Sequence, residues 1–130
     1  RVARHKDDQA FPGTSDLQGD CLEGLASAKA FEARWGNPRG LSSDHLGWEI
    51  EAFYLAQACL NLYLGTRLEK IIIGGGLMQS DALLAKVQIA FDQLLGDYLP
   101  ISGKKIILSP GLGEHAGVLG GAVVALRSLS

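Results

Sequence analysis

The chain has 130 residues, of which 47% are hydrophobic, and this is enough apolar side chain for one domain with a sizeable buried core. Its formal net charge of -2 excludes the strongly basic surface that attracts nucleic acids or anionic membranes. We therefore expect neither a nucleic-acid partner nor a membrane partner.

The cysteines and the apolar segments indicate a reduced, soluble setting. Cys21 lies in a segment rich in Gly and Asp and Cys59 in an apolar helical pattern, which does not resemble a disulfide framework. The longest nearly apolar stretch, residues 50–64, is shorter than the roughly 20 residues that span a bilayer. We expect a soluble cytoplasmic protein.

In chain order, residues 1–22 contain many Gly, Asp, Pro and Ser, which predicts a short strand followed by a long loop. Apolar residues then recur at helical spacing, so a helix is expected from Cys21 or Leu22 to Arg34. The sequence Gly36-Asn37-Pro38 ends it, as Gly and Pro beyond a last helical turn usually do.

A second loop leads to a long helix over residues 46–64. Ser43 or Asp44 is the expected N-cap, since both side chains accept hydrogen bonds from the first free backbone N–H groups of a helix. The helix is apolar on most sides, and we therefore expect it to be buried between two layers.

The second half of the chain alternates short apolar runs with helical patterns. Residues 70–73 contain three consecutive Ile, which predicts a strand covered on both faces as in parallel sheets, and residues 105–108 predict a second strand. Residues 81–95 show an amphipathic helical pattern, and residues 114–129 predict a helix rich in Gly and Ala. This order is typical of an α/β fold with a small mixed or parallel sheet flanked by helices.

Three motifs carry a resemblance to a known family. They are the run Gly19-Asp20-Cys21-Leu22-Glu23-Gly24-Leu25-Ala26-Ser27, the run Gly74-Gly75-Gly76-Leu77-Met78 and the segment 110–117. In this order and spacing they resemble the ROK sugar kinases, specifically the fructokinase-like branch. The resemblance implies the actin-like, ribonuclease H-like ATPase fold, with residues 1–130 as its C-terminal lobe and further strands in the missing N-terminal half.

In ROK proteins the loop before the first helix resembles a zinc knuckle. The matching positions here are His5, Ser15, Gln18 and Cys21. Structural zinc takes four nitrogen or sulfur ligands, a requirement that His5 and Cys21 meet and that Ser15 and Gln18 do not. The resemblance thus implies a degenerate zinc-loop region over residues 1–22, and tight zinc binding is not expected.

The resemblance assigns sugar and nucleotide contacts to residues 23–130. It implies that Glu23 binds the sugar, because a carboxylate accepts charge-assisted bonds from vicinal hydroxyls; stabilising the first turn of a helix is the alternative. Lys29 stands in a segment that contacts nucleotide in the family, and it either reaches a phosphate or is solvated. The adenosine part of ATP is expected at Gly74-Gly75-Gly76-Leu77-Met78, where a tight strand–helix joint would also explain the glycines.

The resemblance implies an ATP-dependent hexose kinase, most like a fructokinase, that works with Mg²⁺ and forms a homodimer. Neither the family's Asp-x-Gly-Gly-Thr phosphate turn nor its Asn-Asp base segment occurs in residues 1–130. We therefore expect no catalytic residue in this chain and no phosphate transfer by the chain alone. The alternatives are a sugar-sensing ROK repressor and a degenerate relative that keeps the fold without catalysis.

Overall fold

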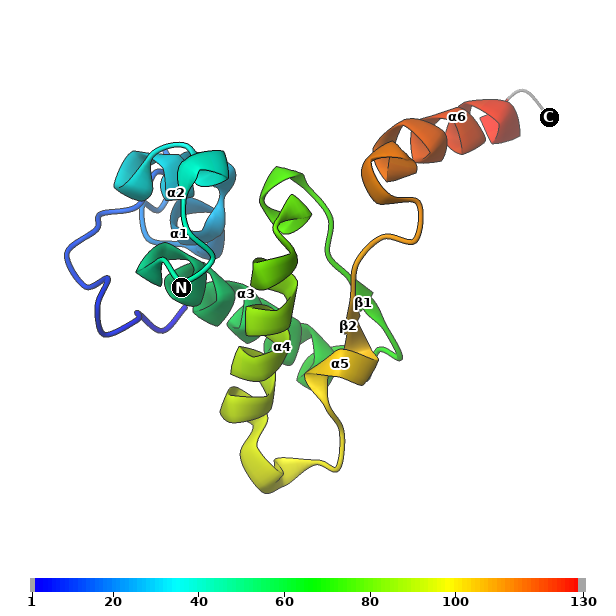
Figure 1. Ribbon diagram of the computed structural model, residues 1–130. Helices are drawn as coiled ribbons and strands as arrows, with labels where there is room; N and C mark the ends of the chain where they lie inside the picture. The colour runs from blue at the N-terminus through cyan, green and yellow to red at the C-terminus, as the bar shows by residue number, and fades with distance from the viewer. Residues whose placement is uncertain (1, 129–130) are drawn as a thin grey trace.

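The computed structural model describes residues 2–128 as helices joined by loops, with one short parallel sheet (Figure 1). The helices are α1 (Leu22–Ala26), α2 (Ala28–Trp35), α3 (Leu46–Thr66), α4 (Asp81–Leu95), α5 (Gly103–Ile106) and α6 (Ala116–Ser128). The strands are β1 (Ile71–Ile72) and β2 (Ile107–Leu108), and the short 3₁₀ turns include η1 (Pro38–Gly40) and η2 (Gly76–Gln79).

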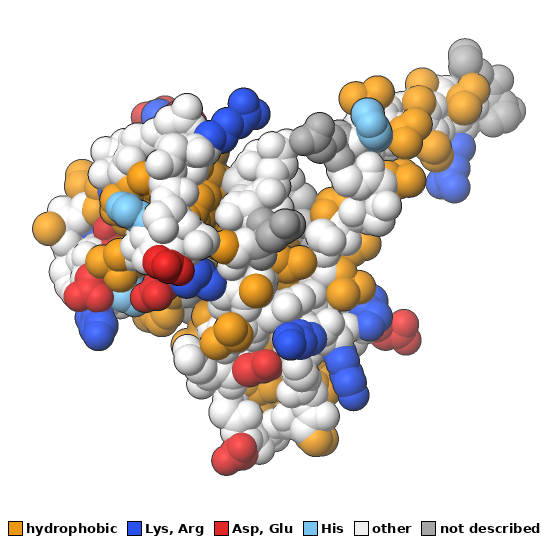
Figure 2. All heavy atoms as spheres, in the orientation of Figure 1, with side chains coloured by type: hydrophobic (Ala, Val, Ile, Leu, Met, Phe, Trp, Pro, Cys, Tyr) orange, Lys and Arg blue, Asp and Glu red, His pale blue; other side chains and the backbone are white. Residues whose placement is uncertain are grey.

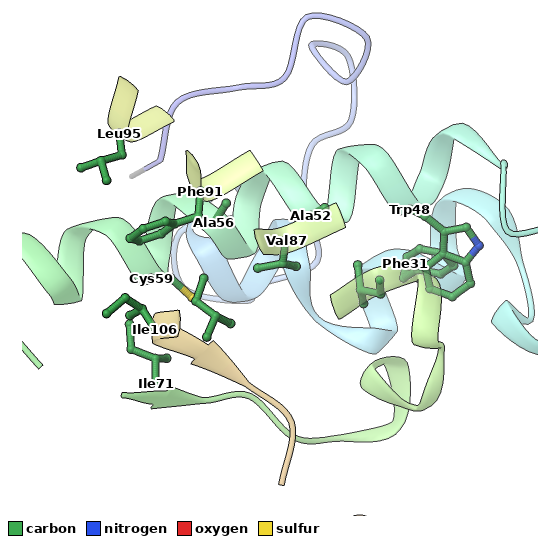
Figure 3. Packing of buried hydrophobic residues seen from close by; sticks show 12 residues of the cluster. Phe31, Trp48, Ala52, Ala56, Cys59, Ile71, Val87, Phe91, Leu95 and Ile106 are labelled. Carbon is green, nitrogen blue, oxygen red and sulfur yellow. The ribbon is translucent and has the colours of Figure 1, made fainter. Parts of the chain in front are cut away.

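Helix α3 lies at the centre of the core because two of its sides are covered. One side packs with α2 and α4 through side chains spaced at helical intervals, namely Trp48, Ala52, Ala56 and Cys59. Figure 3 shows Phe31 of α2 and Trp48 together at one end of this cluster. The other side packs against Leu25 of α1 through Ile50 and Tyr54. The expected burial between two layers is confirmed for this part of α3, whereas Leu62 near its end is 51% exposed.

The N-cap of α3 is His45, so the prediction of Ser43 or Asp44 was wrong. The backbone of His45 is extended, and its Nδ1 accepts a hydrogen bond from the Gly47 N–H at 3.0 Å. Imidazole nitrogen therefore does here what a Ser or Asp oxygen does at most helix starts.

The helix expected from Leu22 to Arg34 is divided in two at Ser27. The backbone of Ser27 is extended, with ψ 159°, and its side chain accepts a hydrogen bond from the Ala30 N–H at 3.2 Å. Because a Ser that caps a new helix competes with continuation of the old one, α1 ends and α2 begins at this residue.

Strands β1 and β2 are parallel, as their predicted order requires, with Ile71 beside Ile107 and Ile72 beside Leu108. Only one face of the pair is covered, since Ile71 and Ile107 are buried while Ile72 is 65% exposed. The prediction of a strand covered on both faces was therefore wrong for this chain. The second strand is also shorter than predicted, because residues 103–106 form α5.

The N-terminal segment is a loop, and no strand occurs between residues 2 and 22, contrary to the sequence-based prediction. The loop is nevertheless fixed to α3 at its start. The Gln57 amide accepts from the Ala3 N–H at 2.9 Å and donates to the Ala3 carbonyl at 3.0 Å. A side chain thus supplies the pair of bonds that a neighbouring strand would have supplied.

Helix α6 extends away from the rest of the chain (Figure 1). It begins two residues later than predicted, after a 3₁₀ turn at Gly113–His115. Leu129, the predicted last residue of this helix, lies outside the described residues. Apolar side chains cover its visible surface (Figure 2), and Val118 is 76% exposed. Over residues 2–128, no helix is both long and apolar enough to cross a membrane.

The core predicts a contrast between two side chains of α4. Phe91 is fully buried and its ring meets Tyr63 edge-on at 6.2 Å, whereas Ile89 is 54% exposed. Phe91→Ala should lower the free energy of unfolding by about 3–5 kcal/mol, because a cavity remains in the core. Ile89→Ala is the matched control and should cost less than about 1 kcal/mol. Urea denaturation of both variants measures this, and equal losses would contradict the packing described.

Candidate functional site

Two cavities meet at the turn that follows β1. The first, of about 930 Å³, lies between this turn and the end of α2, and the second, of about 660 Å³, lies between the turns that follow β1 and β2. Gly76 and Gln79 line both of them. Both volumes are typical of small-molecule sites. In parallel sheets, ligands gather at the carboxyl ends of the strands, which is where these cavities lie.

The structure brings the five predicted adenosine contacts together at this point. Gly74, Gly75, Gly76 and Met78 line the second cavity, and Gly76 and Leu77 line the first. They lie together because β1 ends at Ile72 and the chain then turns into η2.

The three glycines have different reasons to be glycine. Gly75 has φ 114° and ψ 172°, a conformation that is open almost only to glycine. A Cβ at Gly74 would lie 3.2 Å from Cγ of Pro110, which is tighter than ordinary contact. A Cβ at Gly76 would meet nothing within 4 Å. The tight turn between β1 and η2 therefore accounts for glycine at positions 74 and 75. Gly76 is not required by the turn in this way, and the space beside it is open where the two cavities adjoin.

Sequence reasoning missed the opposite wall of the first cavity. Glu32 of α2, Asn37 and Arg39 of the following turn, and Trp48 of α3 all line it. The Asn37 side chain accepts from the Arg39 N–H at 3.0 Å and so shapes this turn. The sequence pattern predicts only that the helix ends in this segment. The signal that it offers for a site is a cation, Arg39, within a turn rich in Gly and Pro.

Glu23 and Lys29 are exposed and line neither cavity. Glu23 lies in the first turn of α1, and Lys29 lies in the first turn of α2, next to Ala28 on the wall of the first cavity. The structure thus separates the predicted sugar residue from the glycine turn, and both Glu23 and Lys29 remain predictions.

Of the four zinc-knuckle positions, only His5 and Cys21 carry side chains of the type that binds structural zinc. His5 Nδ1 already accepts from the Asp7 N–H at 3.2 Å, and the Ser15 hydroxyl donates a hydrogen bond to Cys21, which lowers the pKa of the thiol. Gln18 is exposed. Within residues 2–128, no three side chains of the types His, Cys, Asp and Glu are grouped so that they could hold a metal ion. The donors present do not fit structural zinc.

A buried ionic cluster centred on Arg34 lies beside this loop. One guanidinium nitrogen of Arg34 is 2.5 Å from Asp8 Oδ2, and the Tyr54 hydroxyl donates to the same oxygen at 2.7 Å. Arg34 also donates to the carbonyl oxygens of Leu25 and Ala30. Burial lowers the pKa of Arg34, and the Asp8 carboxylate opposes this effect.

Glu51 of α3 completes the cluster as a second carboxyl group without a hydrogen bond. It is fully buried, its Oε2 lies 3.8 Å from Arg34, and neither oxygen has a hydrogen-bond partner in the described structure. Burial raises the pKa of Glu51 to about 8, although the Arg34 charge acts in the opposite direction. At neutral pH the Glu51 carboxyl therefore keeps its proton, and Arg34 pairs with Asp8.

The buried carboxyl predicts a pH-dependent gain in stability for Glu51→Gln. Because the pKa of Glu51 rises from 4.5 in the unfolded chain to about 8 in the folded one, the wild-type chain is destabilised as the pH rises through this window. Gln stays neutral, so the stability advantage of the variant should grow by on the order of 1 kcal/mol per pH unit in that window.

Urea denaturation near pH 5 and near pH 8 measures this advantage. Glu49→Gln is the control, because the Glu49 side chain is 57% exposed and lies 3.6 Å from Lys86. A stability difference between Glu51→Gln and the wild-type chain that does not change with pH would contradict the assignment.

Comparison with known proteins identifies the family. A strand–helix–strand unit with cavities at the strand ends is typical of α/β proteins, in which ligands gather at that edge of the sheet. Residues 6–128 match the ROK family over nearly the whole chain, and the chain belongs to that family. Membership implies the actin-like ATPase fold, with which the helices and the small parallel sheet are consistent.

Similar curated proteins are named as fructokinases. That of Zymomonas mobilis subsp. mobilis is 39% identical over 129 residues, covering 96% of this chain and 43% of that protein. That of Lactococcus lactis subsp. cremoris is 39% identical over 118 residues, covering 88% and 41%. That of Streptococcus mutans serotype c is 36% identical over 132 residues, covering 97% and 45%. The chain thus spans about two fifths of the length of these relatives.

Proposed function

We propose that this chain is the nucleotide-holding part of an ATP-dependent hexose kinase, most like a fructokinase. The observation that carries the proposal is the pair of ligand-sized cavities that share Gly76 and Gln79 as lining residues, with nothing within 4 Å of a Cβ built at Gly76. The names of the similar proteins supply the reaction, and phosphate transfer belongs to the whole protein.

The lining of the first cavity suits a nucleoside. Leu41 and Leu77 offer apolar surface to a flat base, and the Glu32 carboxylate is an acceptor for the hydroxyls of a ribose. Arg39 adds a cation to the same wall. A base and ribose bound here would lie beside the glycine turn.

The second cavity suits the phosphate chain. Its wall includes Gly74 and Gly75 after β1, Ser109 after β2, and Ala116 and Gly117 at the start of α6. Backbone N–H groups in such turns and at a helix N-terminus favour anions. A nucleotide that passes Gly76 would therefore place its phosphates in this cavity.

The catalytic chemistry requires groups that this chain does not offer. Among the lining side chains that the structure describes, Glu32 is the single carboxylate, and it lines the first cavity. The second cavity, where we propose the phosphates, therefore offers no described carboxylate to Mg²⁺. The contribution of this chain is positioning of the nucleotide, which is a large part of catalysis in phosphoryl transfer.

We place the sugar at α1, where Glu23 is exposed at the first helical turn. This helix lies apart from the glycine turn, so the sugar would approach the phosphate from outside the two cavities. The cellular setting proposed is the cytoplasm, which the free thiols of Cys21 and Cys59 support.

A non-catalytic relative is the second candidate function. It is favoured by Lys29, a charged side chain within the segment that contacts nucleotide in the family, and by the zinc-knuckle positions Ser15 and Gln18, which do not suit the metal. Such a protein would bind nucleotide or sugar without phosphate transfer by the whole protein. An assay of the whole protein with fructose and Mg-ATP separates the two candidates.

The nucleotide proposal predicts a loss of ADP affinity in Gly75→Ala. Because Ala does not tolerate the conformation of Gly75, the turn would move and affinity should fall about tenfold or more. Titration followed by tryptophan fluorescence measures the affinity, because Trp48, one of the two tryptophans, lines the first cavity. Gly65→Ala is the control, since a Cβ there meets nothing within 4 Å and the backbone is helical. Equal affinities of both variants and the wild-type chain would refute the site.

The sugar proposal predicts a KM effect in the whole protein. Glu23→Gln removes the charge but not the shape of the side chain, so the KM for fructose should rise about ten- to hundredfold. The KM for ATP should stay within about twofold, because Glu23 lies outside both cavities. Steady-state kinetics measure both constants, with the exposed Glu69→Gln as control. An unchanged KM for fructose would remove Glu23 from the sugar site.

A further inference from the structure

The loop that resembles a zinc knuckle packs against the helices although its donor set does not fit zinc. Two of the four matching positions carry oxygen or amide side chains, and His5 and Cys21 are already hydrogen-bonded to Asp7 and Ser15. Another interaction must therefore hold residues 2–20 in place on the helices.

Backbone hydrogen bonds close the knuckle turn and join it to the start of α1. The Gly19 N–H donates to the Ser15 carbonyl at 2.9 Å, and the Thr14 N–H donates to the Gly24 carbonyl at 2.9 Å. A Cβ added at Gly13 or at Gly24 would lie within 2 Å of the Gly19 carbonyl oxygen. The loop and the start of α1 thus pack backbone against backbone, in a contact that side chains would prevent.

Arg34 ties this loop to the helices. Its guanidinium group is 6% exposed and pairs with Asp8, and it lies 4.5 Å from the ring centroid of Phe11. Both partners belong to the loop. Arg34 also contacts helix residues. It donates a hydrogen bond to the Leu25 carbonyl near the end of α1, and its guanidinium carbon lies 4.2 Å from the ring centroid of Trp35.

Tyr54 of α3 joins the same cluster from the other side. The Tyr54 hydroxyl donates a hydrogen bond to Asp8. The Tyr54 hydroxyl oxygen also accepts a hydrogen bond from the His5 N–H at 3.3 Å. The side chains of Asp8, Arg34 and Tyr54, which we call the Arg34 anchor, therefore connect the loop to α2 and α3. Each of the three is nearly or fully buried, so their bonds form out of water, where they are strong.

We infer that the Arg34 anchor holds the loop of residues 2–20 on the helices in the role that the family resemblance gives to zinc, and that this chain needs no metal there. A buried arginine suits this role because its fixed donors can bind a carboxylate and several carbonyl oxygens at once. The inference concerns the loop alone and holds whether or not the whole protein is a kinase.

Amide hydrogen exchange at Thr14 and Gly19 tests the anchor, because both N–H groups bond within the loop region. Tyr54→Phe removes only the hydroxyl and should speed exchange at both amides about tenfold, the effect of one lost hydrogen bond. Asp8→Asn should do the same or more. Tyr63→Phe removes a hydroxyl from the same helix away from the loop and is the matched control. Unchanged exchange in Tyr54→Phe and Asp8→Asn would overturn the inference.

Zinc supplies the second arm. The purified chain, incubated with zinc and desalted, should hold none by elemental analysis, and its loop exchange should not respond to a chelator. One zinc retained per wild-type chain would overturn the inference. In the double variant Ser15→Cys with Gln18→His, which restores nitrogen and sulfur donors, bound zinc should offset most of the exchange that Tyr54→Phe adds. Failure of zinc to offset it in that background would show that metal and anchor hold different parts of the chain, again against the inference.

Discussion

Helix α3 carries apolar side chains on two sides, and both must be covered for the chain to be stable in water. Helix α4 covers one side, while α1 and the N-terminal loop cover the other. The first cavity exists because of this arrangement. The ring centroids of Trp48 in α3 and Phe31 in α2 lie 4.7 Å apart, and Trp48 also lines the cavity. The packing of α2 on α3 therefore sets the distance between the two walls of the first cavity.

Much of the fold could be predicted because it depends on pattern. The helices α3 and α4 and the parallel pairing of the two Ile-rich strands follow from periodicity and order. The break at Ser27 and the N-cap at His45 could not be predicted, since each depends on a single hydrogen bond that one side chain accepts from a nearby backbone N–H. The exposure of Ile72 was also unpredictable, because a run of Ile indicates a strand but not which helices or strands of the chain cover each of its faces.

The candidate site was predictable where it follows a strand end. The glycine turn could be placed because ligands gather at such ends, whereas Asn37 and Arg39 enter the cavity only through the packing of α2 against α3. The pairing of Asp8 with Arg34 joins residues that are 26 positions apart, so no local pattern marks it. Glu51 is a charged residue within an apolar helical pattern, and its full burial follows from the packing around α3 rather than from the sequence pattern.

The central claim is that the glycine turn and the α2–η1 segment hold a nucleotide. The most direct measurement is a backbone amide NMR titration of the chain with ADP. The account predicts that shifts concentrate at residues 74–80 and 37–39, which line the two cavities. Shifts confined to other parts of the chain, or none at saturating ADP, would contradict it.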